Sequence, residues 1–105
     1  MYGTLSRYKI APGSADRLAR EVQESFVPIV SKLPGFREYF WINSGDNVMC
    51  SLSIFDNRAG AEESVRKAAD WVRERNLGSL LPNPPEVTTG EIVAHQAAPP
   101  RSATA

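Results

Sequence analysis

The chain has 105 residues, of which 42% are apolar, and its 12 basic and 12 acidic side chains cancel. This length fits one domain, and the charge balance excludes the basic surface on which nucleic-acid binding and polybasic membrane attachment depend. No apolar run approaches the roughly 20 residues that cross a bilayer, and the N-terminus lacks the order of a signal peptide. We therefore expect a cytoplasmic protein with neither nucleic acid nor a membrane as partner.

The first predicted element is a strand from Tyr2 to Ile10. Successive side chains of a strand point to opposite faces, and the even-numbered set suits packing against helices better. This assignment points Arg7 and Lys9 the other way.

A helix is predicted from an N-cap at Ser14 to about Lys32. Pro28 lies inside this pattern and predicts a kink or a change of helix nearby, and Pro34-Gly35 ends the helix. Apolar residues at steps of three and four form its inward stripe, namely Leu18, Val22, Phe26, Ile29 and Leu33.

Two strands, 36–43 and 48–55, are predicted to form a hairpin closed by a loop of four or five residues around 44–47. The first of them is apolar on both faces, and the sequence leaves open which face meets the helices. Cys50, the only cysteine, lies in the second strand, so no internal disulfide can form.

The remaining elements are a helix capped by Asp56 or Asn57 and ending near Leu77, and a strand from Glu86 to His95. Small and apolar residues form the helix's inward stripe, with Trp71 beside it: Ala61, Val65, Ala68 and Val72. Leu80 and Leu81, in the intervening loop, are expected to dock on the body of the domain. We predict a folded domain over residues 1–95 and a disordered tail over 96–105.

The order strand-helix-strand-strand-helix-strand is the ferredoxin-like βαββαβ arrangement, an α+β fold with a four-stranded antiparallel sheet. Both helices then cover one face of the sheet. The other face stays bare although it carries apolar residues, and such a patch normally marks an interface. We therefore expect a homodimer in which two sheets pack together.

Several short motifs support a family resemblance. They are 9–16 (KIAPGSAD), 33–36 (LPGF), the strand 48–55 that ends in an aromatic residue before a capped helix, and 69–72 (ADWV). With the element order, these resemble the antibiotic biosynthesis monooxygenase-like proteins of the dimeric α+β barrel superfamily over residues 2–95. The motifs are specific for the fold and weak for chemistry.

The resemblance implies a ligand pocket between sheet and helices or within the barrel. It also implies, as in some members, oxidation of a polycyclic phenol without metal or flavin, so that no cofactor is expected. Arg7 would then stabilise a phenolate. An aromatic slot would be lined by Tyr39, Trp41, Met49 and Phe55, with Ser51 and Ser53 as hydrogen-bond partners. The competing interpretation is that Arg7 is solvated or bridges the dimer and that the aromatics are packing.

Other chemistry finds less support. The haem-degrading branch of the superfamily has a Trp where this chain has Phe55, and an axial His on a helix that here, over 59–77, contains none. His95 is the only histidine, and with Cys50 it gives no metal-ligand spacing. The leading hypothesis is a homodimer that resembles cofactor-independent monooxygenases and takes an aromatic or hydrophobic small molecule. The alternative is a non-catalytic binding or structural dimer of the same fold.

Overall fold

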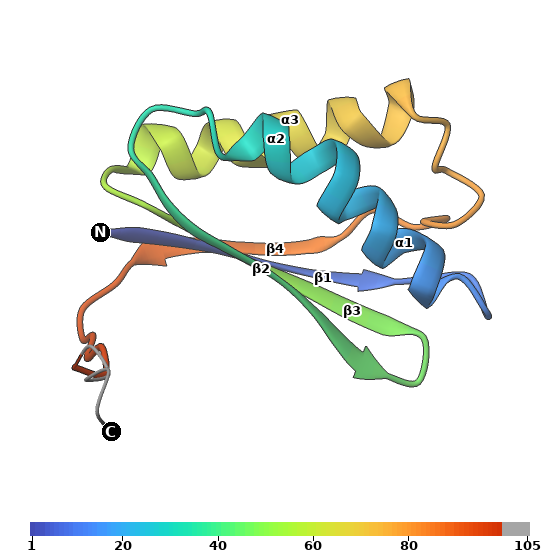
Figure 1. Ribbon diagram of the computed structural model, residues 1–105, viewed down its shortest axis with the longest axis horizontal. Coiled ribbons are helices and arrows are strands. Elements are labelled where there is room, and N and C mark those ends of the chain that lie inside the picture. The colour runs from blue at the N-terminus through green and yellow to red at the C-terminus, as the bar shows by residue number, and fades with distance from the viewer. Residues whose placement is uncertain (100–105) are drawn as a thin grey trace, which may run out of the picture.

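The structure, a computed structural model, describes residues 1–99 of the chain. Its strands are β1 (Tyr2–Lys9), β2 (Phe36–Gly45), β3 (Val48–Phe55) and β4 (Glu86–Glu91). Its helices are α1 (Ala15–Glu21), the π-helix η1 (Val22–Phe26), α2 (Val27–Val30) and α3 (Arg58–Glu74). The strands form one antiparallel sheet in the order β2-β3-β1-β4, and all helices lie over one face of it (Figure 1). The predicted ferredoxin-like α+β fold is confirmed.

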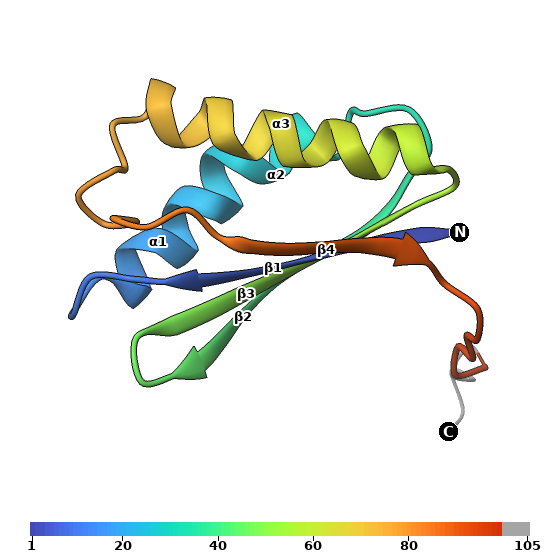
Figure 2. The ribbon, with the colours of Figure 1, turned by 180° about the vertical axis from the view of Figure 1, so that it is seen from behind.

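The two faces of the sheet differ in what covers them. We call the side of the sheet toward the helices the helix face and the opposite side the bare face. Figure 2 shows the same arrangement with the molecule turned to its other side. On β1 the even-numbered Thr4, Ser6 and Tyr8 are buried and Tyr2 is partly buried, whereas Leu5 is 47% exposed. This alternation confirms that the even set faces the helices and that Arg7 points away from them.

The first helical segment changes its winding before Pro28. A π-turn over 22–26 separates α1 from α2, and Pro28 then stands in the first turn of α2, where its missing N–H costs little. Of the predicted alternatives, the change of helix is confirmed, and the helix ends at Val30 rather than near Lys32. Val30 is fully buried, whereas Ile29 and Leu33 are only partly buried against the core.

Ser14 occupies the N-cap position of α1 without capping it through its side chain. Its hydroxyl instead donates to the Ala11 carbonyl oxygen at 2.6 Å. Ser14 is therefore the N-cap residue as predicted, but it does not cap through its side chain, because the preceding turn already uses the hydroxyl.

The β2–β3 hairpin is tighter than predicted. Its loop is the pair Asp46-Asn47 alone, with φ of 52° and 59°, the values of a type I′ turn. The predicted loop of four or five residues is wrong, because Gly45 adopts φ of 80° and lets the strand continue through a bulge.

A second irregularity in β2, between Phe36 and Glu38, settles which face of the strand meets the helices. The extra residue there lets Phe36, Tyr39 and Trp41 pack against the buried core. Phe40 and Ile42 are left on the bare face, 45% and 46% exposed.

The C-terminal half is anchored at both ends of α3. Asn57 caps the helix by accepting a hydrogen bond from the Gly60 N–H at 2.9 Å. Leu77 and Leu81 are buried beyond its C-terminus, so the loop docks as expected. The helix ends at Glu74 and not at Leu77.

The last strand is shorter than predicted. β4 ends at Glu91, where its partner β1 begins at Tyr2, so His95 lies beyond the ladder. Of the tail predicted for 96–105, residues 96–99 are exposed and outside regular structure, and 100–105 lie outside the described residues.

Candidate functional site

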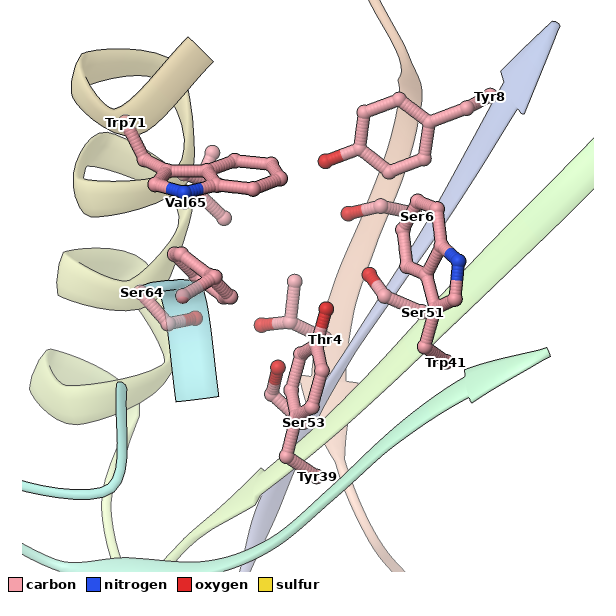
Figure 3. A pocket seen from close by; sticks show the side chains of 12 residues that line it. Thr4, Ser6, Tyr8, Tyr39, Trp41, Ser51, Ser53, Ser64, Val65 and Trp71 are labelled. Atoms are coloured by element: carbon pink, nitrogen blue, oxygen red, sulfur yellow. The ribbon is translucent and has the colours of Figure 1, made fainter. Parts of the chain in front are cut away.

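A small cavity lies between the helix face of the sheet and the helices η1 and α3 (Figure 3). We call it the inner cavity; its volume is about 20 Å³, enough for about one water molecule. Its polar lining consists of hydroxyl groups, five from Ser and Thr and two from Tyr: Thr4, Ser6, Ser51, Ser53, Ser64, Tyr8 and Tyr39.

Strand register creates the hydroxyl-rich floor. Ser6 on β1 pairs with Ser51 on β3, and Thr4 pairs with Ser53, so four hydroxyl side chains form two adjacent rows. Directly paired residues of an antiparallel sheet project to the same face. Figure 3 shows these side chains rising from the strands toward α3. A helix-facing strand position is usually apolar, so four small polar residues there provide hydrogen-bonding groups in a buried space.

Aromatic side chains from four elements form the walls. Phe26 of η1 packs against Tyr39 of β2 and Trp71 of α3, with ring centroids 5.5 and 5.2 Å apart. Across the cavity, Tyr8 of β1 packs against Trp41 of β2 at 5.4 Å. The flat walls and polar floor together suit an aromatic ligand that carries oxygen atoms.

Trp71 is fixed by a chain of contacts outside the cavity. Its indole N–H donates to the Ser25 hydroxyl at 2.7 Å, and that hydroxyl donates to the Glu21 carbonyl oxygen at 2.6 Å. The Glu21 carboxylate in turn pairs with Arg75 at 3.0 Å. Ser25 precedes Phe26 inside the π-turn, so this turn supplies both a wall of the cavity and the anchor of a second wall.

The electrostatics of the cavity favour neutral groups. Burial raises the pKa of Tyr8, and the neighbouring Ser6 hydroxyl only partly offsets this. Burial also raises the pKa of Tyr39 well above its usual value; Tyr8 adds to the rise and Ser51 opposes it. Both tyrosines therefore remain protonated at neutral pH, as hydrogen-bond donors rather than bases.

A wider opening adjoins the inner cavity between α3 and the β4 edge. We call it the side groove; its volume is about 210 Å³. It shares with the inner cavity Ser6, Tyr8, Val65 and Ala68, and the rest of its lining is apolar: Ala69, Val72, Pro85 and Val87.

The structure brings together four of the seven predicted site residues. Tyr39, Trp41, Ser51 and Ser53 line the inner cavity. Met49 and Phe55 project to the same face, but both lie in the closed core, with 2% and 0% of their surface exposed.

Arg7 lies elsewhere, on the bare face. It pairs in register with Cys50 and Glu86 and lines a separate hollow with Lys9. The inner cavity and Arg7 therefore occupy opposite sides of the sheet, because odd-numbered residues of β1 point away from the helices.

Other lining residues were not predicted as site residues, among them Ser6, Tyr8, Phe26, Ser64 and Trp71. Part of this lining could be predicted from the sequence, because the even-numbered residues of β1 and the apolar stripe of the first helix are both predicted to face the interior. The hydroxyl rows required the pairing register, which the sequence leaves open.

Metal and membrane sites find no support in the described part of the chain. Among residues 1–99, no three His, Cys, Asp or Glu side chains gather as a metal site would require. Within the same range, no helix combines the length and the apolar character of a bilayer span.

Comparison with known proteins identifies solved structures of the same fold. No protein-family model matches the sequence, and no curated protein sequence matches it. Among solved structures, a protein of unknown function from Nitrosomonas europaea is similar at 22% identity, with a TM-score of 0.74 over 94% of this chain and 95% of that one.

Two further structures carry the name of an activity. A monooxygenase from Streptomyces coelicolor, solved with nanaomycin D, is similar at 12% identity, with a TM-score of 0.70 over 95% of this chain and 92% of that one. A Chloroflexus aurantiacus protein, provisionally named an antibiotic biosynthesis monooxygenase, matches at 17% identity with a TM-score of 0.67, over 91% of this chain and 96% of that one. The chain has the fold of the antibiotic biosynthesis monooxygenase-like proteins. The resemblance predicted from the motifs is thus confirmed at the level of the fold.

Proposed function

We propose that the protein binds an aromatic small molecule in the side groove, with an oxygen-bearing end in the adjoining inner cavity, and oxidises it with molecular oxygen, without a metal or flavin. The observation that carries this proposal is the lining of the cavity, which combines aromatic walls with a floor of serine and threonine hydroxyls. The shared fold with proteins named as monooxygenases adds an argument by analogy.

The proposed chemistry asks little of the protein. With 1,4-dihydroxynaphthalene as substrate, both hydroxyl groups lose their hydrogen atoms and become the two carbonyl groups of a quinone, and O₂ takes up the two electrons and two protons and leaves as hydrogen peroxide. The substrate supplies all the electrons. Tyr8 and Tyr39 would donate hydrogen bonds to the substrate oxygen, where negative charge develops once a proton is lost.

We further propose that the protein is a homodimer joined through its bare faces. Leu5, Phe40 and Ile42 are 45–47% exposed there, and Leu5 and Phe40 both pair in register with Leu52, which makes an apolar row across three strands. An exposed patch of this kind is usually covered by a partner, and a second copy offers the same patch.

In such a dimer Arg7 would lie between the subunits, beside the hollow that it shares with Lys9. A phenolate stabilised by Arg7 would then occupy a chamber within the barrel, not the inner cavity. The two locations are separable by mutation. Oxidation in the inner cavity requires Tyr39 and tolerates Arg7→Ala, and oxidation within the barrel shows the reverse.

The second candidate is binding without catalysis. It is favoured by the absence, among the described residues that line the inner cavity, of a carboxylate, histidine or amine that would take a proton from the substrate. The raised pKa values of Tyr8 and Tyr39 make these residues poor bases.

Oxygen uptake separates the candidates. We expect purified protein to consume one O₂ per molecule of 1,4-dihydroxynaphthalene oxidised, and Tyr39→Phe to slow the reaction while leaving the fold intact by circular dichroism. A rise in melting temperature with this quinol but no uptake above the buffer rate would establish the binding-only candidate. If the quinol causes neither a rise in melting temperature nor oxygen uptake, both candidates are rejected.

A further inference from the structure

The inner cavity and the side groove meet at one boundary. Both are lined by Ser6 and Tyr8 on β1 and by Val65 and Ala68 on α3. We call these four residues the doorway. The groove is lined by Val87 of β4, the edge strand of the sheet, and Figure 2 shows α3 running over this strand. The end of a ligand in the groove would therefore lie next to the inner cavity.

Polarity changes across the doorway. Inside it lie the hydroxyls of Ser51, Ser53 and Tyr39, whereas the groove beyond is lined by apolar side chains such as Val72 and Val87. A ligand that spans both spaces is bound best with its oxygen-bearing end inward and its apolar part in the groove, because unpaired polar groups are costly to bury.

The uncharged lining of the two spaces restricts which ligands can bind. Among the described residues, no Asp, Glu, Lys, Arg or His lines either space. An ionised carboxylate, sulfonate or ammonium would enter without a counter-charge, at a desolvation cost that hydroxyl groups offset only in part. A neutral carbonyl or hydroxyl loses much less on entry and can be fully hydrogen-bonded.

The volumes of the two spaces limit the size of the ligand. The side groove holds about 210 Å³. An apolar cavity of about 150 Å³ takes up a benzene molecule, so the groove accommodates about one ring. The inner cavity adds room for about one polar atom.

We propose that the ligand is a neutral molecule of one or two rings that enters past β4, places a carbonyl or hydroxyl group among the Ser51, Ser53 and Tyr39 hydroxyls, and keeps its apolar ring in the side groove. This inference rests on the proposed function for the location of the ligand. It adds the charge, size, orientation and route of the ligand.

A pair of matched probes tests the charge. 1-Naphthol and 1-naphthoate share the same two rings, and at neutral pH the first is uncharged and the second is an anion. We expect 1-naphthol to bind in isothermal titration and 1-naphthoate to bind roughly tenfold more weakly, because its carboxylate finds no counter-charge. Equal or tighter binding of 1-naphthoate would overturn the proposal, as would failure of 1-naphthol to bind.

Substitutions test the route. Ala68→Phe fills the doorway and should abolish 1-naphthol binding, whereas Ala59→Phe, on an exposed position of the same helix, should not. Because Ala68→Phe affects packing, Val87→Trp provides a second test on a side chain that is 41% exposed at the groove, and it should weaken binding severalfold. Wild-type affinity in folded Ala68→Phe or in Val87→Trp would overturn the route. Oxidation of 1,4-dihydroxynaphthalene that persists in both variants would leave the proposed function standing while the route fails.

Discussion

Ser25 shows how one side chain outside a cavity can determine its shape. Its hydroxyl accepts from the Trp71 indole and donates to the Glu21 carbonyl, and so ties α3 to the π-turn. Neither residue stands out in the sequence, where Trp71 only adjoins a helical stripe. The contact depends on the extra residue per turn that the π-helix introduces, which a pattern based on 3.6 residues per turn does not predict.

We expect Ser25→Ala to destabilise the protein by about 1–3 kcal/mol, because the largely buried indole N–H loses its partner. Urea unfolding measures this change. Ser25→Thr, which keeps the hydroxyl, is the control. A double-mutant cycle with Trp71→Phe should show clear non-additivity, and strict additivity would contradict the proposed link between the two side chains.

Tyr39 makes the free energy of unfolding depend on pH in the alkaline range. Its pKa is raised in the folded protein, chiefly by burial, so above about pH 10 the unfolded chain loses a proton that the folded chain keeps. The contribution of the raised pKa is therefore complete below about pH 10 and is lost as pH rises further. We expect the unfolding free energy of Tyr39→Phe to fall less steeply with pH than that of wild type above this value. Equal slopes in urea titrations would contradict the assignment.

At this scale the sequence identified part of the candidate site. Tyr39, Trp41, Ser51 and Ser53 follow from an aromatic strand beside an alternating one, and they do line the cavity. Arg7 was proposed with them although the same alternation sends it to the bare face. Distance across a sheet cannot be read from sequence adjacency, since neighbours along a strand face opposite ways.

Among the helices and strands, α3 depends on the close packing of its first turn against the neighbouring chain. A Cβ at Gly60 would lie 2.7 Å from Phe55 Cδ1 and 2.9 Å from the Pro34 carbonyl oxygen. The glycine therefore lets the helix start directly against β3 and against the turn that precedes β2. This contact positions the face of α3 that carries Ser64 and Ala68.

We expect Gly60→Ala to destabilise the fold by about 1–3 kcal/mol through overpacking. Gly78→Ala is the matched control, because nothing lies within 4 Å of a Cβ at that position, and its effect should stay within about 0.5 kcal/mol. Chemical denaturation of the two variants provides the comparison. Similar stability for both would contradict the packing argument.

The boundaries of the helices and strands were predicted less accurately than their order. The strand and helix order was predicted correctly, because hydrophobic periodicity and Pro-Gly breaks determine it. The hairpin loop was predicted too long, since Gly45 can extend a strand as readily as it can end one. β4 was predicted too long because its length depends on where its partner β1 begins, which is not a local property.

At the scale of the whole molecule, the described helices all lie over the helix face of the sheet. The proposed dimer would cover the bare face. We expect wild-type protein to scatter light as a dimer at micromolar concentration. Phe40→Asp should yield a folded monomer, because it places a charge in the apolar row through which the two copies would pack. Gln23→Asp, on the exposed side of η1, should leave the dimer intact. A monomeric wild type would contradict the proposed assembly.

The helix-face cavity is the centre of this account, and it does not depend on the dimer. The most direct test is a crystal structure of the protein with 1-naphthol. The account predicts electron density between β1, β3 and α3, with the naphthol oxygen within hydrogen-bond distance of Tyr39 or Ser51 and the rings toward Val87. Density confined to the bare face beside Arg7, or an unchanged inner cavity and side groove at saturating naphthol, would contradict it.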